Sequence, residues 1–257
     1  MNTDRQVQRG AWRKIGMAAL AVSLWMGCGE GSFGVDPTGS GGTPGAPGGP
    51  NQTPGSQPAI GTVYTGEGTF YGADGSGNCS YDASPNDLLV AAMNAVDYRT
   101  AAWCGACLAV TGPSGSVTVR VVDQCPECAQ GDLDLSPEAF ALLAPLSAGR
   151  VPITWHLVAC DVTGPIAYHF KDGANPFWTA IQLRNHRYPI AKLEAMQAGA
   201  YVEIPRVDYN YFVEPAGLGP GPYQLRVTDQ RGHVLEDSAV ALGDDVTRTG
   251  AAQFPAC

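Results

Sequence analysis

Apolar side chains recur at every second position in several short runs after residue 60, which is the spacing of a β-strand with one buried face. The clearest run is SVTVRVV at 116–122, where valines alternate with polar residues. The segment 79–87 has no such period and predicts a loop. In the first half the pattern predicts strands at 61–71, 108–111, 116–122 and 151–158, together with an apolar run at 88–93.

One segment of the first half carries the signals of a helix start. Ser136 can cap the first turn, and Pro137 has the fixed φ angle that suits the first helical position. Glu138 then places a negative charge near the positive end of the helix dipole. A helix is therefore predicted over the AFALLAPL run that follows.

The second half also reads as short strands separated by turns. Their spacing is typical of an all-β sandwich. The joint at 161–165 is brief, so we expect the two halves to share a face. The predicted strands lie at 166–170, 178–184, 191–195, 201–205 and 223–228, with a turn at Gly232 and one more strand after it.

The N-terminus has the pattern of an export signal. Four basic residues precede an apolar run at 15–26, which ends before Gly27 and Cys28. A secretory signal is therefore predicted over residues 1–28, since the run is too short for a comfortable membrane span. The segment 24–28 also resembles a bacterial lipobox, in which Cys28 would be lipidated and anchor the protein to the outer membrane. The basic residues are Arg5, Arg9, Arg13 and Lys14.

A Gly/Pro-rich stretch separates this signal from the folded sequence. Ten of the residues at 29–58 are Gly and six are Pro, so the segment lacks the apolar surface that would repay its ordering entropy. It predicts a disordered linker at 29–59, either a tether after the lipobox or the leader of a fully secreted protein. Two domains then follow, at 60–161 and 162–257.

Charge and histidine spacing exclude several functions. The formal net charge is −9, and no basic stripe with interleaved aromatics is present, so nucleic acid is not an expected partner. The four histidines have neither HxH nor HExxH spacing, so we expect structural roles for them and neither a metal nor another cofactor. They are His156, His169, His186 and His233.

The cysteines permit more than one chemistry. Two CxxC pairs, at 104–107 and 125–128, are 17 residues apart, which fits a zinc ribbon. Export favours disulfides instead, and a redox CxxC is the third alternative. Cysteine count leaves one thiol over once Cys28 is removed, and we expect it to be Cys257. The disulfide candidates are Cys79, Cys104, Cys107, Cys125, Cys128 and Cys160, with the connectivity left open.

Motifs in the first half resemble the first domain of expansins, including bacterial expansins and fungal loosenins. They are VVDQCP at 121–126 and GDLDLSP at 131–137, with GTFYG at 68–72 similar to the family's opening strand. Cys125 departs from the Tyr of some bacterial expansins, which removes one ring that could stack on a sugar.

Motifs in the second half are similar to the expansin carbohydrate-binding domain. They are YHFKDG at 168–173, WTAIQLRNHRYP at 178–189 and DYNYFV at 208–213. The resemblance implies an all-β chain with a six-stranded double-psi β-barrel followed by an immunoglobulin-like sandwich. It also implies a relation to family 45 glycoside hydrolases without their catalytic base, and a monomer that binds cellulose, β-glucan or another wall polysaccharide.

Two carboxylates of the first domain are candidates for one groove. Asp123 ends a predicted strand, and Asp134 follows 11 residues later, between two leucines that could desolvate it and raise its pKa. The resemblance assigns Asp134 to the family's acid position and Asp123 and Thr69 to the same groove. Without the resemblance, Asp134 would more simply cap a turn or the following helix.

Hydrolysis of a glycosidic bond needs a second carboxylate as base or nucleophile. The expansin pattern supplies none at a defined position. Asp74, Asp82 and Asp87 lie in loops that we expect near the rim of the groove, so these loops offer candidate bases.

Aromatic residues of the second domain are candidates for a sugar-binding surface, because flat rings pack on the C–H faces of sugars. Parity in the 177–184 run puts Trp178 outward, with Ala180, Gln182 and Arg184, and Phe177 on the core side. The resemblance instead implies an exposed ring at Phe177. It adds Tyr209 as a third ring of a flat row and Lys171 as a nearby cation, whereas the structural alternative is that these rings are sandwich core.

Three functions compete. The leading hypothesis is a non-lytic protein that loosens plant-type cell wall or cellulose by disrupting glycan–glycan contacts. A weak endoglucanase or peptidoglycan lytic transglycosylase, with Asp134 as general acid, is the enzymatic alternative. A cell-surface carbohydrate adhesin, with the first domain as scaffold, is the third.

Overall fold

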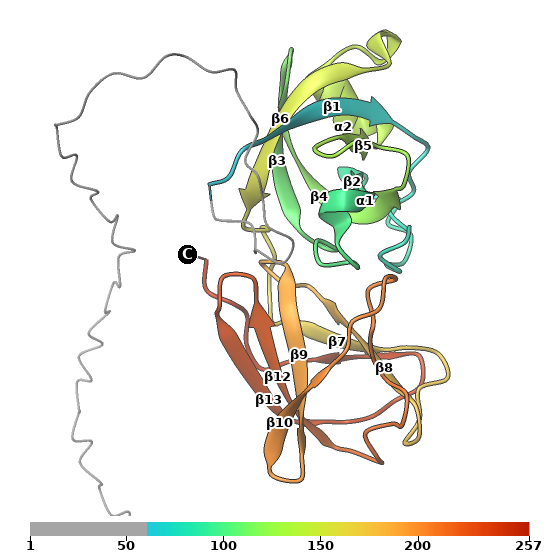
Figure 1. Ribbon diagram of the computed structural model, residues 1–257, viewed down its shortest axis with the longest axis vertical. Helices are drawn as coiled ribbons and strands as arrows, with labels where there is room; N and C mark the ends of the chain where they lie inside the picture. Colours follow the sequence, from blue (N-terminus) through green and yellow to red (C-terminus); the bar gives the residue numbers. More distant parts are fainter. Residues whose placement is uncertain (1–60, 257) are drawn as a thin grey trace, which may run out of the picture. The chain divides into compact units, whose positions relative to one another are not determined.

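The computed structural model describes residues 61–256, and Figure 1 shows their course. The predicted signal, the lipidation site Cys28, the linker and the thiol of Cys257 lie outside the described residues. Within the described part of the chain, no helix has the length and apolar character needed to cross a membrane.

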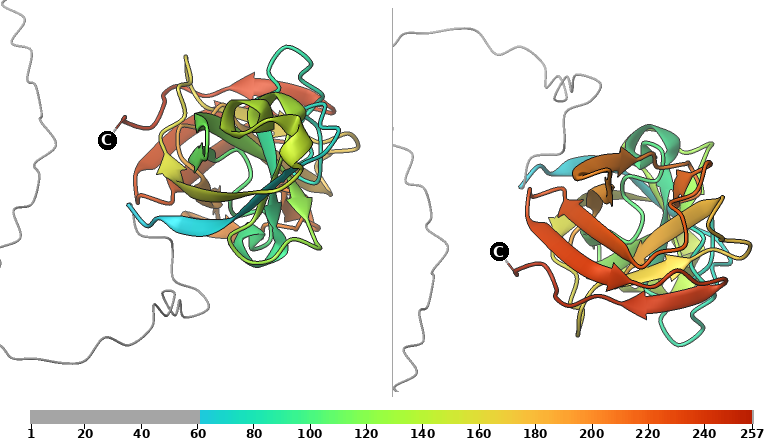
Figure 2. Two further views of the ribbon diagram at one scale, coloured as in Figure 1. Left: turned by 90° about the horizontal axis from the view of Figure 1, so that it is seen from above. Right: turned by 90° about the horizontal axis from the view of Figure 1, so that it is seen from below.

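Six strands of the first half form a closed barrel, as the resemblance implies. Their order around the barrel is β1-β5-β2-β4-β3-β6, and the end-on view of Figure 2 shows them curving around one centre. Two pairings, β1 with β5 and β2 with β4, are parallel, while the others are antiparallel. The strands are β1 (Tyr64–Phe70), β2 (Val90–Asn94), β3 (Cys107–Gly112), β4 (Gly115–Cys125), β5 (Leu133–Leu135) and β6 (Val151–Val158).

Aromatic side chains are a large part of the barrel core. The ring of Tyr64 stacks on Trp155 with 4.0 Å between centroids, and Trp103 meets Trp155 edge-on at 5.7 Å. Both tryptophans are buried. Trp155 also donates its indole N–H to the carbonyl oxygen of Gly131 at 2.7 Å, so the core fixes the loop that leads into β5.

The helix start at Ser136 is confirmed. Helix α2 (Pro137–Leu143) begins with Pro137, and the Ser136 hydroxyl accepts the backbone N–H of Ala139 at 3.1 Å. The sequence pattern missed the short helix α1 (Ala95–Tyr98) and strand β5, because three or four residues are too few to show a period. A 3₁₀ turn, η1 (Leu146–Ala148), follows α2.

The second half forms two four-stranded sheets, β10-β9-β12-β13 and β11-β8-β7-β14, which bury one apolar cluster. The predicted sandwich is therefore confirmed, with β11 and β14 added to the predicted strands. The strands are β7 (Ala167–Phe170), β8 (Thr179–Arg184), β9 (Ile190–Gln197), β10 (Ala200–Ile204), β11 (Phe212–Glu214), β12 (Tyr223–Asp229), β13 (Val234–Val240) and β14 (Val246–Thr249).

All six described cysteines form disulfides. The first CxxC pair does not close on itself, because each of its cysteines binds a partner far along the chain, whereas the second pair does. Since every described thiol is oxidised in this way, the zinc-ribbon alternative is wrong. The pairs are Cys79–Cys104, Cys107–Cys160 and Cys125–Cys128.

Hydrogen bonds tie one loop of the barrel to the sandwich. The carbonyl oxygen of Cys79 accepts side-chain N–H groups from Gln182 (2.8 Å) and Asn210 (3.1 Å). Asp82 pairs with Arg184 at 2.7 Å. Parity predicted that Gln182 lies on the outward side of β8. This side chain is nevertheless fully buried, because the loop of the barrel covers it.

Candidate functional site

Strands β1 and β5 bring Thr69 and Asp134 together. The two strands run parallel with Thr69 opposite Asp134 in register, so their side chains project from the same face. Leu133 and Leu135 are buried on the other side of β5. As a result, the Thr69 hydroxyl donates a hydrogen bond of 2.5 Å to Oδ1 of Asp134.

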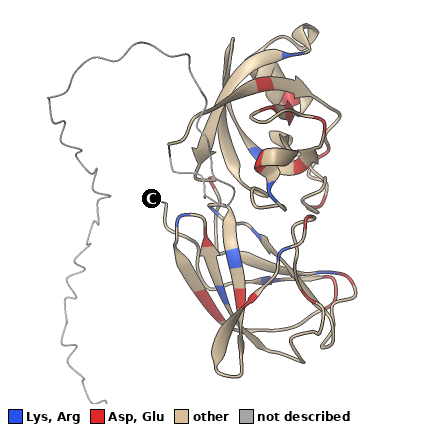
Figure 3. Cartoon of the chain, viewed as in Figure 1, with Lys and Arg blue, Asp and Glu red and all other residues tan. Residues whose placement is uncertain are grey.

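A groove of about 380 Å³ opens in front of this pair. Arg150 is the only Lys or Arg among the described residues that line it, while four acidic residues do so; Figure 3 marks these charges on the chain. The lining residues are Glu67, Thr69, Cys125, Glu127, Cys128, Ala129, Asp132, Asp134 and Arg150.

Partial burial raises the pKa of Asp134 above its ordinary value. The hydrogen bond from Thr69 and the charge of Arg150 lower this pKa, while the negative charges of Glu127 and Asp123 raise it. Asp134 therefore keeps its proton to higher pH than a solvent-exposed aspartate does, and the protonated carboxyl can donate a hydrogen bond as well as accept one.

Asp123 lies close to this groove without lining it. Its Oδ1 accepts backbone N–H groups from Asn78 (2.6 Å) and Gln124 (2.8 Å), so the carboxylate holds the loop before β2. Burial raises the pKa of Tyr71, and the charges of Asp123 and Asp134 add to that effect. Both carboxylates thus flank Tyr71, which the sequence analysis did not single out.

The three loop carboxylates expected at the rim have other contacts. Asp82 pairs with Arg184 and Asp87 with Arg120 at 3.2 Å, and neither lines the groove. Asp74 accepts hydrogen bonds from the N–H and hydroxyl of Ser76, which lower its pKa. None of the three lines the groove, so the expectation that they rim it is wrong.

Among the acids that do line the groove, Glu127 differs from the rest. Glu67 forms an ion pair of 2.5 Å with Arg150, and Asp132 accepts the backbone N–H of Glu67 at 2.8 Å. Glu127 is exposed, on the turn that the Cys125–Cys128 disulfide closes. Sequence reasoning missed Glu127 and Arg150, because only the closed barrel brings them beside Asp134.

On the sandwich, Phe177 is the most exposed large apolar side chain among the described residues, at 82%. The parity prediction that placed it on the core side is therefore wrong. The reason is that β8 starts at Thr179, and Phe177 lies in a preceding turn where its N–H donates to Oδ1 of Asn175 at 2.9 Å. Strand parity does not extend into a turn.

The other residues predicted to form the sugar-binding platform with Phe177 lie just outside the strands: Trp178 directly precedes β8, Lys171 directly follows β7, and Tyr209 is in the turn before β11. Trp178 is partly exposed and forms an isolated bridge with Asn175. Tyr209 is partly exposed, and its ring centroid lies 5.9 Å from that of the buried Tyr211. The Nζ of Lys171 lies 5.5 Å from the Tyr211 ring centroid. Tyr211 therefore contacts both the predicted cation and the ring of Tyr209.

A chain of hydrogen bonds joins the groove region to the platform. Asn78, whose N–H binds Asp123, donates its side-chain amide to the carbonyl oxygen of Asp208 at 3.0 Å. The hydroxyl of Tyr98 donates to the same oxygen at 3.0 Å. Because Asp208 precedes Tyr209, these bonds fix the backbone that carries that ring.

Comparisons with known proteins agree with this arrangement. A family model described as "Lytic transglycolase" matches residues 77–155. The chain is 37% identical to Expansin-YoaJ of Bacillus subtilis over 79% of this chain and 91% of that protein. It is 30% identical to Expansin-B3 of Arabidopsis thaliana over 66% and 73% of the two chains. A crystal structure of a mutant Clavibacter michiganensis expansin in complex with cellohexaose superposes with a TM-score of 0.71 at 33% identity, covering 76% of this chain and 99% of that one.

Proposed function

Because this chain belongs to the expansin family, we propose that it is a non-lytic protein that binds cellulose or a related β-glucan and loosens cell-wall material. The rings on the sandwich hold the protein on a glycan chain. The groove of the barrel then competes for the hydrogen bonds that join this chain to its neighbours.

The main support for this proposal is the hydrogen bond between Thr69 and Asp134. A carboxyl with a raised pKa, held at the mouth of a groove, can donate to one glycan oxygen and accept from another hydroxyl. Such an exchange breaks contacts between glycan chains without breaking a covalent bond.

The exposed ring of Phe177 supports the binding half of the proposal. An aromatic side chain that is 82% exposed keeps a large apolar area in water, and stacking on a sugar face would remove part of that area. We expect Trp178 and Tyr209, which are both partly exposed, to extend this apolar surface.

The disulfides favour a site of action outside the cytoplasm, where oxidised cysteines persist. This agrees with the export signal expected at 1–28. A lipid on Cys28 would hold the same protein on the cell surface.

The decisive experiment combines binding and product release in the same tubes. The protein is incubated with cellulose, chitin or peptidoglycan, and bound protein, soluble sugar and wall extension are measured. We expect binding to cellulose and wall loosening without sustained release of reducing ends. Asp134→Asn keeps the shape of the side chain but removes the titrating proton, so it should retain binding and lose at least 80% of the loosening. Glu138→Gln, an exposed acid on α2, is the matched control.

An enzymatic alternative has its own support. The match to the "Lytic transglycolase" model and the raised pKa of Asp134 both suit a general acid, and Glu127 across the same groove is the candidate base. This alternative predicts many turnovers of soluble product, abolished in both Asp134→Asn and Glu127→Gln. Such turnover would overturn the non-lytic proposal.

A further inference from the structure

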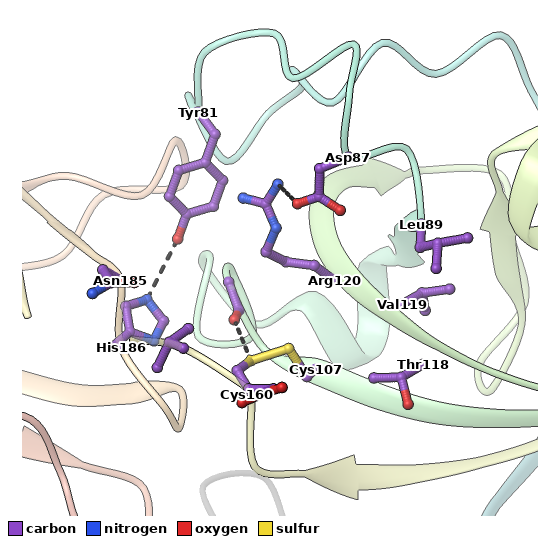
Figure 4. A pocket seen from close by; sticks show the side chains of 13 residues that line it. Tyr81, Asp87, Leu89, Cys107, Thr118, Val119, Arg120, Cys160, Asn185 and His186 are labelled. Atoms are coloured by element: carbon purple, nitrogen blue, oxygen red, sulfur yellow. Dashed lines mark hydrogen bonds and ion pairs between the residues drawn. A yellow bond between two sulfur atoms is a disulfide. The ribbon is translucent and has the colours of Figure 1, made fainter. Parts of the chain in front are cut away.

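A second pocket, of about 410 Å³, lies where the barrel meets the joint to the sandwich (Figure 4). It shares no residue with the groove or with the platform. Strand β4, the loop before β2, the joint after β6 and the turn after β8 all contribute to its lining. The volume lies within the range of roughly 300–1,000 Å³ that is common for small-molecule sites.

Arg120 lies at the centre of this pocket. Its guanidinium pairs with Asp87 at 3.2 Å and lies over the ring of Tyr81, 5.6 Å from the centroid. The Arg120 side chain is still 29% exposed. A guanidinium has five N–H donors in a planar fork, so it can bind Asp87 and still donate to two oxygens of a ligand.

The pocket offers the acceptors and the apolar wall that a sugar requires. The carboxylates of Asp87 and Asp161 can accept hydrogen bonds from sugar hydroxyl groups. The hydroxyl of the exposed Thr118 can donate or accept a hydrogen bond. Leu89 is 38% exposed and offers apolar surface for C–H groups. A ring with vicinal hydroxyls matches this combination of donors, acceptors and apolar surface.

The charges disfavour an acidic sugar. Asp87 neutralises Arg120, and Asp161 leaves one further negative charge among the lining residues. The carboxylate of an acidic sugar would be repelled by Asp161, whereas a neutral sugar would not.

We propose that this pocket binds one or two neutral sugar units at the end of a glycan branch, separately from the groove and the platform. Binding there would let the protein recognise a branched polysaccharide while the platform rests on the main chain. The proposal does not depend on wall loosening, since it concerns recognition alone.

The test titrates the full-length protein with D-xylose, D-galactose, D-glucose and cellobiose, followed by saturation-transfer NMR. D-galacturonate serves as the acidic counterpart. The background is Trp178→Ala with Phe177→Ala, so that the platform contributes no signal. We expect saturable binding of at least one neutral sugar, at least fivefold tighter than that of D-galacturonate.

Variants locate the binding in the pocket. Thr118 is exposed on β4, so Thr118→Trp should fill the pocket without disturbing the core and weaken sugar binding at least tenfold. Ser116→Trp is the matched control, an exposed position on the same side of the same strand that does not line the pocket. Asp161→Ala, in the exposed joint, should weaken binding about fivefold. It serves as a second pocket variant if Thr118→Trp does not fold.

Three results would overturn the proposal: no saturable binding of any neutral sugar, equal binding by D-galacturonate, or unchanged binding in both pocket variants. Cellulose pull-down of Thr118→Trp in the wild-type platform background is measured in parallel. Retention of cellulose there, with loss of the small sugar, separates this pocket from the expansin function.

Discussion

At the scale of single residues, the chemistry of the groove depends on the protonation of one carboxyl, that of Asp134. Asp134 is partly buried, which favours the neutral acid, while Thr69 donates a hydrogen bond that favours the carboxylate. Thr69 therefore keeps the pKa of Asp134 lower than burial alone would make it. The working pH range of the groove should depend on this single hydroxyl.

Thr69→Val tests that dependence. The variant loses the hydrogen bond to the carboxylate, so the pKa of Asp134 should rise further, and wall loosening should persist to higher pH. Carboxyl NMR of Asp134 and the pH profile of loosening both measure this upward shift of the pKa. Thr69→Ser keeps a hydroxyl and should leave the profile unchanged; a profile moved to lower pH in Thr69→Val would contradict this account.

At the scale of elements, the loop that contains Gly217 and Gly219 determines the position of the turn that carries Phe177. Gly217 has a φ of +75°, and a Cβ there would lie 2.1 Å from the carbonyl oxygen of Pro176 and 2.5 Å from Cα of Phe177. The N–H of Gly219 donates to the same Pro176 oxygen at 3.0 Å. The turn before β8 thus packs on backbone that has no room for a side chain.

Gly217→Ala should therefore displace the turn and weaken cellulose binding about as much as Phe177→Ala, roughly two- to tenfold for the loss of one stacked ring. Gly219→Ala is a close control, because its φ of +80° imposes similar backbone strain while nothing lies within 4 Å of its Cβ. Binding isotherms on cellulose measure both. Equal affinity of Gly217→Ala and Gly219→Ala would show that contact with the turn is irrelevant.

At the scale of the whole molecule, a buried histidine links the barrel to the sandwich. His186 donates its Nδ1–H to the carbonyl oxygen of Tyr188 at 2.8 Å, which leaves Nε2 to accept from the Tyr81 hydroxyl at 3.4 Å. Gly105 makes room for this pair, since a Cβ there would lie 2.5 Å from the Tyr81 oxygen. Burial lowers the pKa of His186 from 6.5 to about 4.

The stability of the protein should consequently fall in mild acid. Below pH 6.5 the unfolded chain protonates His186 while the folded chain does not, so the stability associated with the neutral ring is present above pH 6.5 and is lost as the pH falls towards 4. The expected loss is about 3 kcal/mol, from about 1.4 kcal/mol per pKa unit. Denaturant unfolding of wild type and His186→Gln between pH 4 and 7 measures it. The variant should be less stable at pH 7 but lose less in acid; parallel pH curves would refute the assignment.

The local sequence was sufficient for features that depend on near neighbours. The alternation at 116–122, the helix start at Ser136 and the leucines around Asp134 each act within a few residues, so their consequences were predictable. The strand spacing of the second half also indicated a sandwich, whereas the closed six-stranded barrel was implied by the resemblance of the motifs to expansins.

Only the tertiary structure decided what depends on residues far apart in the chain. It paired Cys79 with Cys104 and Cys107 with Cys160, and it brought Arg150 to the groove. It also decided between the two expectations for Phe177: the ring is exposed, as the resemblance implied, because strand parity does not apply in the turn where this residue lies. Sequence periodicity records which face of an element is buried, whereas partners across space follow from closing the barrel and docking its loops on the sandwich.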